Sequence, residues 1–399
     1  MKKIALFILI GVFSVISLSL LYAYIAYPAE YVNRLLRWRD SDVFDYQKFP
    51  ERPLEIADSP FEFSLNLDEE RIRTSFEDVS GMDDFDSILE DKRTQAFIVI
   101  QDDAILYEKY FNGASRDSIV TSFSTAKSFT SALIGIAISE GHINSVDDPI
   151  TDYLPELAQR DSTFANITIR DLLMMSAGIK YSEFPFVNGD DAKTYYYPDL
   201  RQLALEETRI IGAPGEEFHY NNYHPLLLGL ILERATGTSV ANYLQEKIWK
   251  PIGMEYPGSW SLDEAGFEKM ESGINARAID FAKFGRLFLD EGDWNGVQVV
   301  PAAWVAESTQ AERSIDYANY YYDDFIFADG EGYYKYMWWG IQRDEQTYDF
   351  MALGNHGQFI YISPQKNLII LRFGETYGEI TGAQNWVDMF YGFATNFDE

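Results

Sequence analysis

The 399-residue chain has no cysteine and only four histidines. Without cysteine, the chain cannot form disulfide scaffolds, cysteine-ligated zinc sites, iron–sulfur clusters or a catalytic thiolate. A Ser-His-Asp triad or a histidine-rich metal site would have to be built from these four histidines, which disfavours both. Lysine or tyrosine is therefore the expected partner of any nucleophile.

Positive charge is also scarce, because 32 lysines and arginines face 63 aspartates and glutamates, a net charge of −31. Phosphate backbones bind basic surfaces, so this balance argues against a nucleic-acid partner. Hydrophobic residues make up 47% and aromatic residues 16% of the chain, enough for a core and too many for a disordered protein. A chain of this length usually divides its core, so we expect two subdomains.

Three common catalytic signatures are missing: the Gly-x-Ser-x-Gly elbow, His-Glu-x-x-His and the phosphate-binding Gly-x-x-x-x-Gly-Lys. Their absence disfavours an α/β-hydrolase, a zinc protease and a P-loop enzyme.

The N-terminus carries a long run without charged residues, Ile4–Tyr27, which follows Lys2 and Lys3. About 20 helical residues span a hydrocarbon core, so we expect residues 1–29 to be a membrane anchor. A cleaved signal peptide is the alternative, although its apolar region is usually only about 7–15 residues long. Large domains are exported largely regardless of loop charge, so we expect a single-pass protein with its large C-terminal part outside the cytoplasmic membrane.

Hydrophobic patterning predicts strands, then helices, then strands again. Residues 30–85 form a charged, proline-punctuated lead-in without a strong period. We expect an α+β protein with a sheet-containing subdomain from residues 86–143 and 331–399 and a helical subdomain over 144–330. The predicted strands are 94–101, 104–111, 336–342, 347–353, 358–363 and 368–373, and the predicted helices are 122–141, 168–175, 226–236, 240–248, 278–290 and 384–393.

Ser-x-x-Lys occurs twice. The copy Ser363–Lys366 lies between two predicted strands and contains proline, which is typical of a turn. Ser124 and Lys127 instead open a predicted buried helix, where an i,i+3 spacing puts both side chains on one face. A lysine kept neutral by burial and the helix N-terminus can accept a proton from a serine hydroxyl. The alternative is a serine cap beside a solvated lysine.

Tyr220 and Asn222 form a Tyr-x-Asn motif between a Pro-Gly turn and the apolar helix that starts near Leu226. A tyrosine beside a lysine can take phenolate character, and the Asn222 amide could donate to a substrate carbonyl. Alternatively, Tyr220 is a half-buried packing residue with a bonded hydroxyl.

A glycine-rich stretch, Gly354–Gln358, leads into a predicted strand. Glycines in strands often mark close approach by another backbone or by a ligand. A backbone N–H here, paired with that of Ser124, would form an oxyanion hole. A simple hairpin turn is the alternative.

Taken in this order, the three features resemble the serine β-lactamase and penicillin-binding protein superfamily. The nearest likeness is to its class C β-lactamase-like branch, which includes DD-peptidases, esterases and 6-aminohexanoate-dimer hydrolase. The resemblance covers residues 86–390 and implies a β-lactamase/transpeptidase-like fold, an antiparallel sheet flanked by helices beside a helical subdomain. It places the three family motifs on Ser124 and Lys127, on Tyr220 and Asn222, and on Asn355, His356 and Gly357, with Gln358 supplying the second oxyanion N–H.

The resemblance implies that Ser124, Lys127 and Tyr220 are catalytic and lie within hydrogen-bond distance of one another. It implies an acyl-enzyme mechanism that needs no metal or cofactor. Asn355 replaces the family's lysine, which helps to seat a substrate carboxylate, so we expect hydrolysis of a small ester, amide or β-lactam-like substrate without that group. The alternatives are a DD-peptidase or β-lactamase, and a non-catalytic envelope protein that binds cell-wall fragments. Three aromatic segments are candidates for an acyl pocket or for ordinary packing: 195–197, 320–322 and 338–339.

Overall fold

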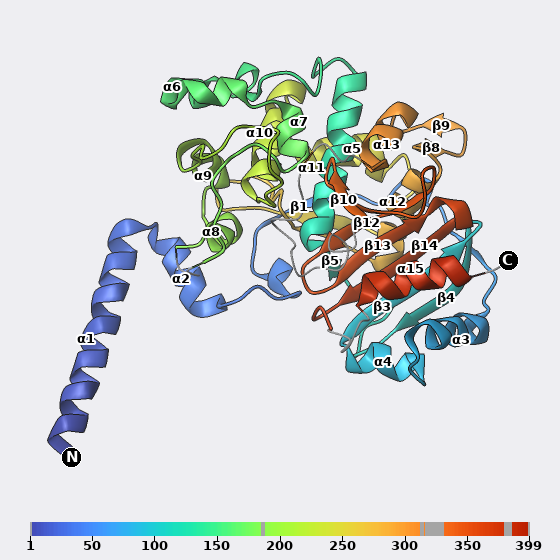
Figure 1. Cartoon of the computed structure of the whole chain (residues 1–399), viewed down its shortest axis with the longest axis horizontal. Helices are drawn as coiled ribbons and strands as arrows, with labels where there is room; N and C mark the ends of the chain where they lie inside the picture. The colour runs from blue at the N-terminus through green and yellow to red at the C-terminus, as the bar shows by residue number, and fades with distance from the viewer. Residues whose placement is uncertain (1, 185–187, 312–314, 316–330, 379–384, 398–399) are drawn as a thin grey trace.

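The computed structural model describes residues 2–184, 188–311, 315, 331–378 and 385–397 (Figure 1). Its main sheet joins both ends of the chain, in the order β10-β11-β12-β13-β14-β3-β4-β2, and only the β2–β4 pair is parallel. The strands are β2 Ser64–Leu65, β3 Thr94–Gln101, β4 Ala104–Tyr110, β10 Gly332–Lys335, β11 Trp338–Gln342, β12 Tyr348–Gly354, β13 Gln358–Ser363 and β14 Leu368–Gly374.

Helices cover both faces of this sheet. Helix α12 (Ala278–Leu289) packs behind β13 and β14, whereas α15 (Trp386–Asn396) crosses the front in Figure 1. Helices α3 (Glu69–Ser80) and α4 (Phe85–Asp91) lie below it in that view, and α3 packs against α15. All eight residues of β3 are buried, which explains its nearly continuous apolar sequence.

Most of the remaining helices gather around α5 (Ala126–Ser139) and α10 (Tyr223–Thr236), which pack against each other. Both are apolar around most of their circumference because neighbours surround them. One continuous cluster of buried apolar side chains joins these helices to the sheet. The other helices of this group are α6 Pro155–Arg160, α7 Ile169–Leu173, α8 Asp190–Tyr196, α9 Leu200–Glu206, α11 Val240–Leu244 and α13 Ala302–Thr309.

A second, smaller sheet, β1-β6-β7-β5, was not predicted. Its strands are two to four residues long, too short to show an alternating pattern. It matters to the site because β5 leads directly into the turn that carries Ser124. The strands are β1 Glu51–Leu54, β5 Val120–Thr121, β6 Gly258–Ser261 and β7 Ile274–Ala276, and β8 Asp293–Trp294 forms a separate hairpin with β9 Val297–Gln298.

The lead-in, residues 30–85, is more regular than its sequence suggested. It contains β1, β2, α3 and all but the first residue of α2 (Ala29–Trp38). In α3, Ile72 and Phe76 have the i,i+4 spacing of a buried helix face. The Phe76 ring stacks on that of Phe393 with centroids 4.1 Å apart. Polar and charged residues around Ile72 and Phe76 obscured the helical period in the sequence.

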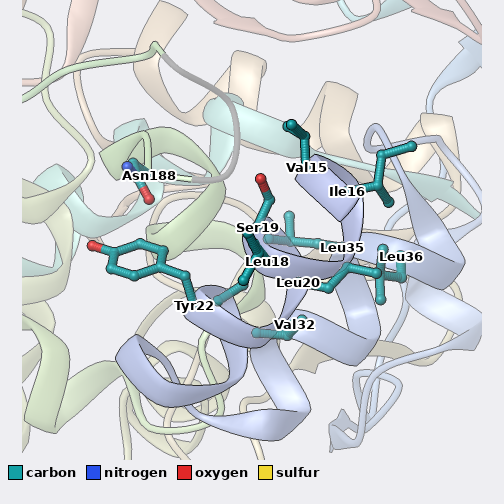
Figure 2. A pocket seen from close by; sticks show the side chains of 11 residues that line it. Val15, Ile16, Leu18, Ser19, Leu20, Tyr22, Val32, Leu35, Leu36 and Asn188 are labelled. Carbon is teal, nitrogen blue, oxygen red and sulfur yellow. The ribbon is translucent and has the colours of Figure 1, made fainter. Parts of the chain in front are cut away.

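Helix α1 (Lys2–Ala26) extends away from the body of the molecule (Figure 1). Its segment Phe7–Ala26 is long and apolar enough to cross a membrane, and its large side chains are exposed. The groove between α1 and α2 is lined almost wholly by apolar side chains, among them Val15, Leu18, Val32 and Leu35 (Figure 2).

Candidate active site

Ser124 lies in a 3-10 turn, Phe123–Thr125, that runs into α5. The turn is anchored to β7, because Ser122 N–H donates to Ile274 O (2.8 Å) and Ile274 N–H donates to Ser122 Oγ (3.0 Å). Phe123 has a φ of 41°, an unfavourable value for a bulky side chain. The hydrogen bonds to β7 therefore hold the backbone next to Ser124 in this strained conformation.

Lys127 is 1% exposed and its amine points at the serine. Its Nζ lies 2.7 Å from Ser124 Oγ and 3.0 Å from the carbonyl oxygen of Glu271. The first contact is short enough for direct proton transfer, and the second fixes the amine. A solvated lysine beside a capping serine does not fit this geometry.

Tyr220 presents its aromatic ring to the amine of Lys127. Lys127 Nζ is 4.9 Å from the ring centroid, and in the described part of the chain the phenol hydroxyl makes no hydrogen bond to Lys127 or Ser124. This differs from the expected hydrogen-bonded trio. The reason is that Trp339 stacks on the Tyr220 ring (5.7 Å) and Tyr334 packs edge-on (6.0 Å), so aromatic packing sets the ring plane.

Asn222 is held by two residues that the sequence did not single out. Its Nδ2 donates to Tyr181 Oη (2.9 Å) and lies 3.2 Å from Asp191 Oδ1, to which the Tyr181 hydroxyl also donates (3.0 Å). The Asn222 amide N–H is therefore engaged already. The Asn222 Oδ1 is buried and has no hydrogen-bond partner among the described residues. This acceptor suits a hydrogen-bond donor on the substrate, whereas we predicted that Asn222 would donate to a substrate carbonyl.

The third motif forms the turn between β12 and β13. His356 and Gly357 have φ values of 61° and 75°. The His356 ring lies 4.8 Å from that of Phe123, and its Nε2 is 3.5 Å from Ser41 Oγ in the lead-in. The close approach expected for a glycine occurs at Gly354, where a Cβ would lie 2.5 Å from Ser122 O, 3.1 Å from Ser124 N and 3.2 Å from Gln358 Cβ.

A small cavity of about 70 Å³ opens beside Ser124. Asn222 and Asn355 line it, and so do three carboxylate side chains. One of these, Asp191, is exposed along part of its side chain, yet desolvation raises the pKa of its carboxyl group. The full lining is Asp40, Ser41, Phe123, Ser124, Asp191, Ala192, Tyr195, Tyr196, Asn222, Glu271, Ser272 and Asn355.

The aromatic segments divide between the site and the core. Tyr195 and Tyr196 line the cavity and Trp339 contacts Tyr220, whereas Trp338 packs in the core against Phe288 (4.5 Å). The segment 320–322 lies outside the described residues.

A buried ion pair lies directly behind Lys127. The Glu271 carboxylate accepts from Lys269 Nζ (2.7 Å) and Ser272 Oγ (3.1 Å), while the Glu271 carbonyl holds Lys127. Burial lowers the pKa of Lys269, whose ammonium lies over the rings of Tyr195 (4.2 Å) and Phe49 (4.6 Å). No local motif marked this pair, because strand and loop packing brings it to the site.

Known proteins resemble this chain over most of its length. The family model Beta-lactamase matches residues 85–382. The 6-aminohexanoate-dimer hydrolase of Paenarthrobacter ureafaciens is 29% identical over 310 residues, which cover 72% of this chain and 74% of the relative.

Solved structures agree with the observed fold. A candidate 6-aminohexanoate-dimer hydrolase from Bacillus anthracis has a TM-score of 0.72 and 27% identity, and the match covers 90% of this chain and 92% of that one. A class C β-lactamase has a TM-score of 0.59 at 16% identity, covering 84% and 99% of the two chains, and supports the fold alone. The chain therefore belongs to the β-lactamase family and is a hydrolase of the serine β-lactamase and penicillin-binding protein superfamily.

Proposed function

We propose that this protein is a membrane-anchored serine hydrolase that cleaves ester or amide bonds through an acyl-enzyme on Ser124. The observation that carries the proposal is the 2.7 Å contact between Lys127 Nζ and Ser124 Oγ, made by an almost fully buried amine. The similarity to a 6-aminohexanoate-dimer hydrolase supports an amide among the substrates.

In the proposed mechanism, Ser124 Oγ attacks the substrate carbonyl carbon as its proton passes to the Lys127–Tyr220 pair. The N–H groups of Ser124 and Gln358 stabilise the oxyanion, and each such donor is typically worth about 3–4 kcal/mol. The tetrahedral intermediate expels the alcohol or amine, which takes the proton through Tyr220. Water then adds to the acyl-enzyme and releases the carboxylic acid. Catalytic hydrogen bonds often tighten only when substrate binds, which allows the Tyr220 hydroxyl to join the relay.

The charge of the cavity supports a substrate without an acyl carboxylate. Lys269 pairs with Glu271, and the other two carboxylates of the lining, Asp40 and Asp191, form no salt bridge among the described residues. Asn355 offers no cation at the position where the family's lysine seats a carboxylate. A substrate carboxylate would therefore meet like charge rather than an anchor.

Covalent labelling tests the nucleophile. We expect a fluorophosphonate probe to label the wild-type protein and not Ser124→Ala, and a nitrophenyl ester to give a burst of nitrophenol. An unlabelled wild type would support a binding protein instead. Rapid turnover of a chromogenic cephalosporin would contradict the substrate class while leaving the nucleophile intact.

We also propose that α1 anchors the protein with its catalytic domain on the outer face of the cytoplasmic membrane. The exposed apolar side chains of α1 support this, because a bilayer would remove them from water. External protease added to intact cells should digest the catalytic domain. A domain that stays intact until the cells are lysed would reverse the orientation, and a mature chain lacking residues 1–26 would indicate a cleaved signal.

A further inference from the structure

Arg372 on β14 is a buried guanidinium, 0% exposed. Its Nη1 donates to Gly357 O (2.8 Å), its Nη2 to Lys92 O (2.9 Å) and its Nε to Thr94 Oγ1 (3.1 Å). Both terminal nitrogens also lie 3.3–3.4 Å from Thr376 O, and the guanidinium lies 4.2 Å from the Trp386 ring centroid.

Every group that Arg372 contacts in the described part of the chain is neutral. Burying an ion without a counter-ion costs several kcal/mol. Burial lowers the pKa of Arg372 to about 9, so the group remains charged at neutral pH. The fold therefore accommodates an isolated positive charge next to the third motif.

Three glycines make room for this guanidinium. A Cβ at Gly357 would overlap Nη1, a Cβ at Gly374 would lie 2.6 Å from Nη1, and a Cβ at Gly378 would lie 3.0 Å from Nη2. Side chains at any of these positions would displace the arginine. The pocket is thus shaped for it from three separate positions in the chain.

The Gly357 carbonyl that Arg372 binds belongs to the same peptide unit as the Gln358 N–H. In a trans peptide these two groups point in opposite directions, so a hydrogen bond that fixes the carbonyl also fixes the N–H. A charged donor on the carbonyl further polarises the peptide and strengthens its N–H as a donor. The hairpin partner of Gln358 is Gly354, which lies against Ser124 N, so this peptide is close to the nucleophile.

We propose that Arg372 is a positioning residue for the oxyanion hole, because it orients and polarises the Gly357–Gln358 peptide whose N–H stabilises the transition state. This inference rests on the proposed function, in which Gln358 supplies that N–H. Arg372 lies outside all three motifs, and its effect on the acylation rate passes through this peptide.

The test compares full-length Arg372→Met and Arg372→Lys with the wild type on a nitrophenyl ester and on its thionoester analogue. An oxyanion hole favours oxygen over sulfur, so weakening it lowers kcat for the oxo ester and reduces the oxo-to-thiono ratio. We expect Arg372→Met to lose about 10- to 100-fold in kcat, less than the roughly 100- to 1,000-fold cost of removing an oxyanion donor itself, with KM changed less than about twofold. We expect its oxo-to-thiono ratio to fall about tenfold, and Arg372→Lys to lie between this variant and the wild type.

Arg343→Met is the matched control, because Arg343 is a partly buried arginine that binds Asp349 and Tyr391 O (3.2 Å), away from the third motif. It should lower the melting temperature and leave the oxo-to-thiono ratio unchanged. If Arg372→Met does not fold, Arg372→Lys decides. A wild-type ratio and kcat in the folded Arg372 variant overturn the inference while the proposed function stands. Ester turnover that survives Ser124→Ala overturns both.

Discussion

Gly354, at the end of β12, lies against the turn that carries Ser124. A Cβ there would lie 2.5 Å from Ser122 O and 3.1 Å from Ser124 N, so Gly354→Ala must push the Ser124 turn away from β12. Displacements near 1 Å can cost about 100-fold in rate, and we expect a fall of that order in kcat/KM for an ester.

Gly212→Ala is its control, because the nearest atom to that Cβ would be 3.8 Å away. Kinetics and thermal melting should be measured for both variants. Wild-type kcat/KM in Gly354→Ala would show that the turn has more freedom than its packing indicates.

Tyr220 allows its ring and its hydroxyl to be tested separately. Tyr220→Phe keeps the stack on Trp339 and the ring face toward Lys127, and removes only the oxygen. If the phenol transfers protons, kcat should fall about 100- to 10,000-fold. The control is Tyr334→Phe, which changes the edge-on neighbour of Tyr220. Near-normal turnover in Tyr220→Phe would restrict proton transfer to Lys127 alone.

Motif residues such as Ser124, Asn222 and Asn355, which line one cavity, could be predicted because each motif is a short local pattern with a recognisable context. Their catalytic and substrate-binding roles stay predictions. Tyr181, Asp191, Lys269 and Arg372 could not be predicted, because tertiary packing alone brings them to the site. The same packing turned the Tyr220 ring toward Lys127, so the residue was identified and its contact was not.

At the scale of the element, α10 carries a buried histidine immediately after the Tyr-x-Asn motif. His224 is 1% exposed, and its two ring nitrogens have no hydrogen-bond partner in the described part of the chain. Burial lowers its pKa to about 3, against about 6.5 in the unfolded chain. Between these values the unfolded state binds a proton that the folded state does not, so stability is lost as pH falls from about 6.5 toward 3.

Replacing this histidine should make folding less sensitive to acid. As the pH falls from 6 to 4, the free energy of unfolding should decrease less steeply in His224→Leu than in the wild type. We expect the two slopes to differ by about 1 kcal/mol per pH unit. Urea titrations at several pH values measure this slope. His142→Gln, in the exposed turn after α5, is the control. An unchanged slope in His224→Leu would mean that His224 is protonated without unfolding.

Long elements followed their patterns, as the agreement of β3, β13, α10 and α12 with the predicted ranges shows. Short ones did not. The strands of the small sheet gain their order from pairing with one another, and α2 from burial of Tyr31 and Arg34 against other parts of the fold. No local period encodes either kind of stabilisation.

At the scale of the whole molecule, the lead-in is part of the body that holds the candidate site. Arg34 donates to Tyr196 O (3.1 Å), Phe49 packs on Lys269, and Asp40 and Ser41 line the cavity. A chain that begins at Pro28 should therefore keep its ester turnover and melting temperature. A chain that begins at Glu51 should melt at least about 5 °C lower and lose at least about tenfold in kcat/KM. Equal behaviour of the two truncations would show that the lead-in is dispensable.

The pairing of β3 with β14 joins two distant parts of the polypeptide, since Thr94 and Arg372 are 278 positions apart yet hydrogen-bonded. A ribosome must therefore synthesise the chain as far as β14 before β3 can pair with it. Until then, β3 has no strand paired along one of its edges, and its side chains are apolar on both faces. An unpaired apolar strand of this kind is prone to aggregation. Contacts this remote in sequence also predict slow folding. Chaperone dependence during biosynthesis is the expected consequence of an architecture in which the last strands complete the sheet that the first ones begin.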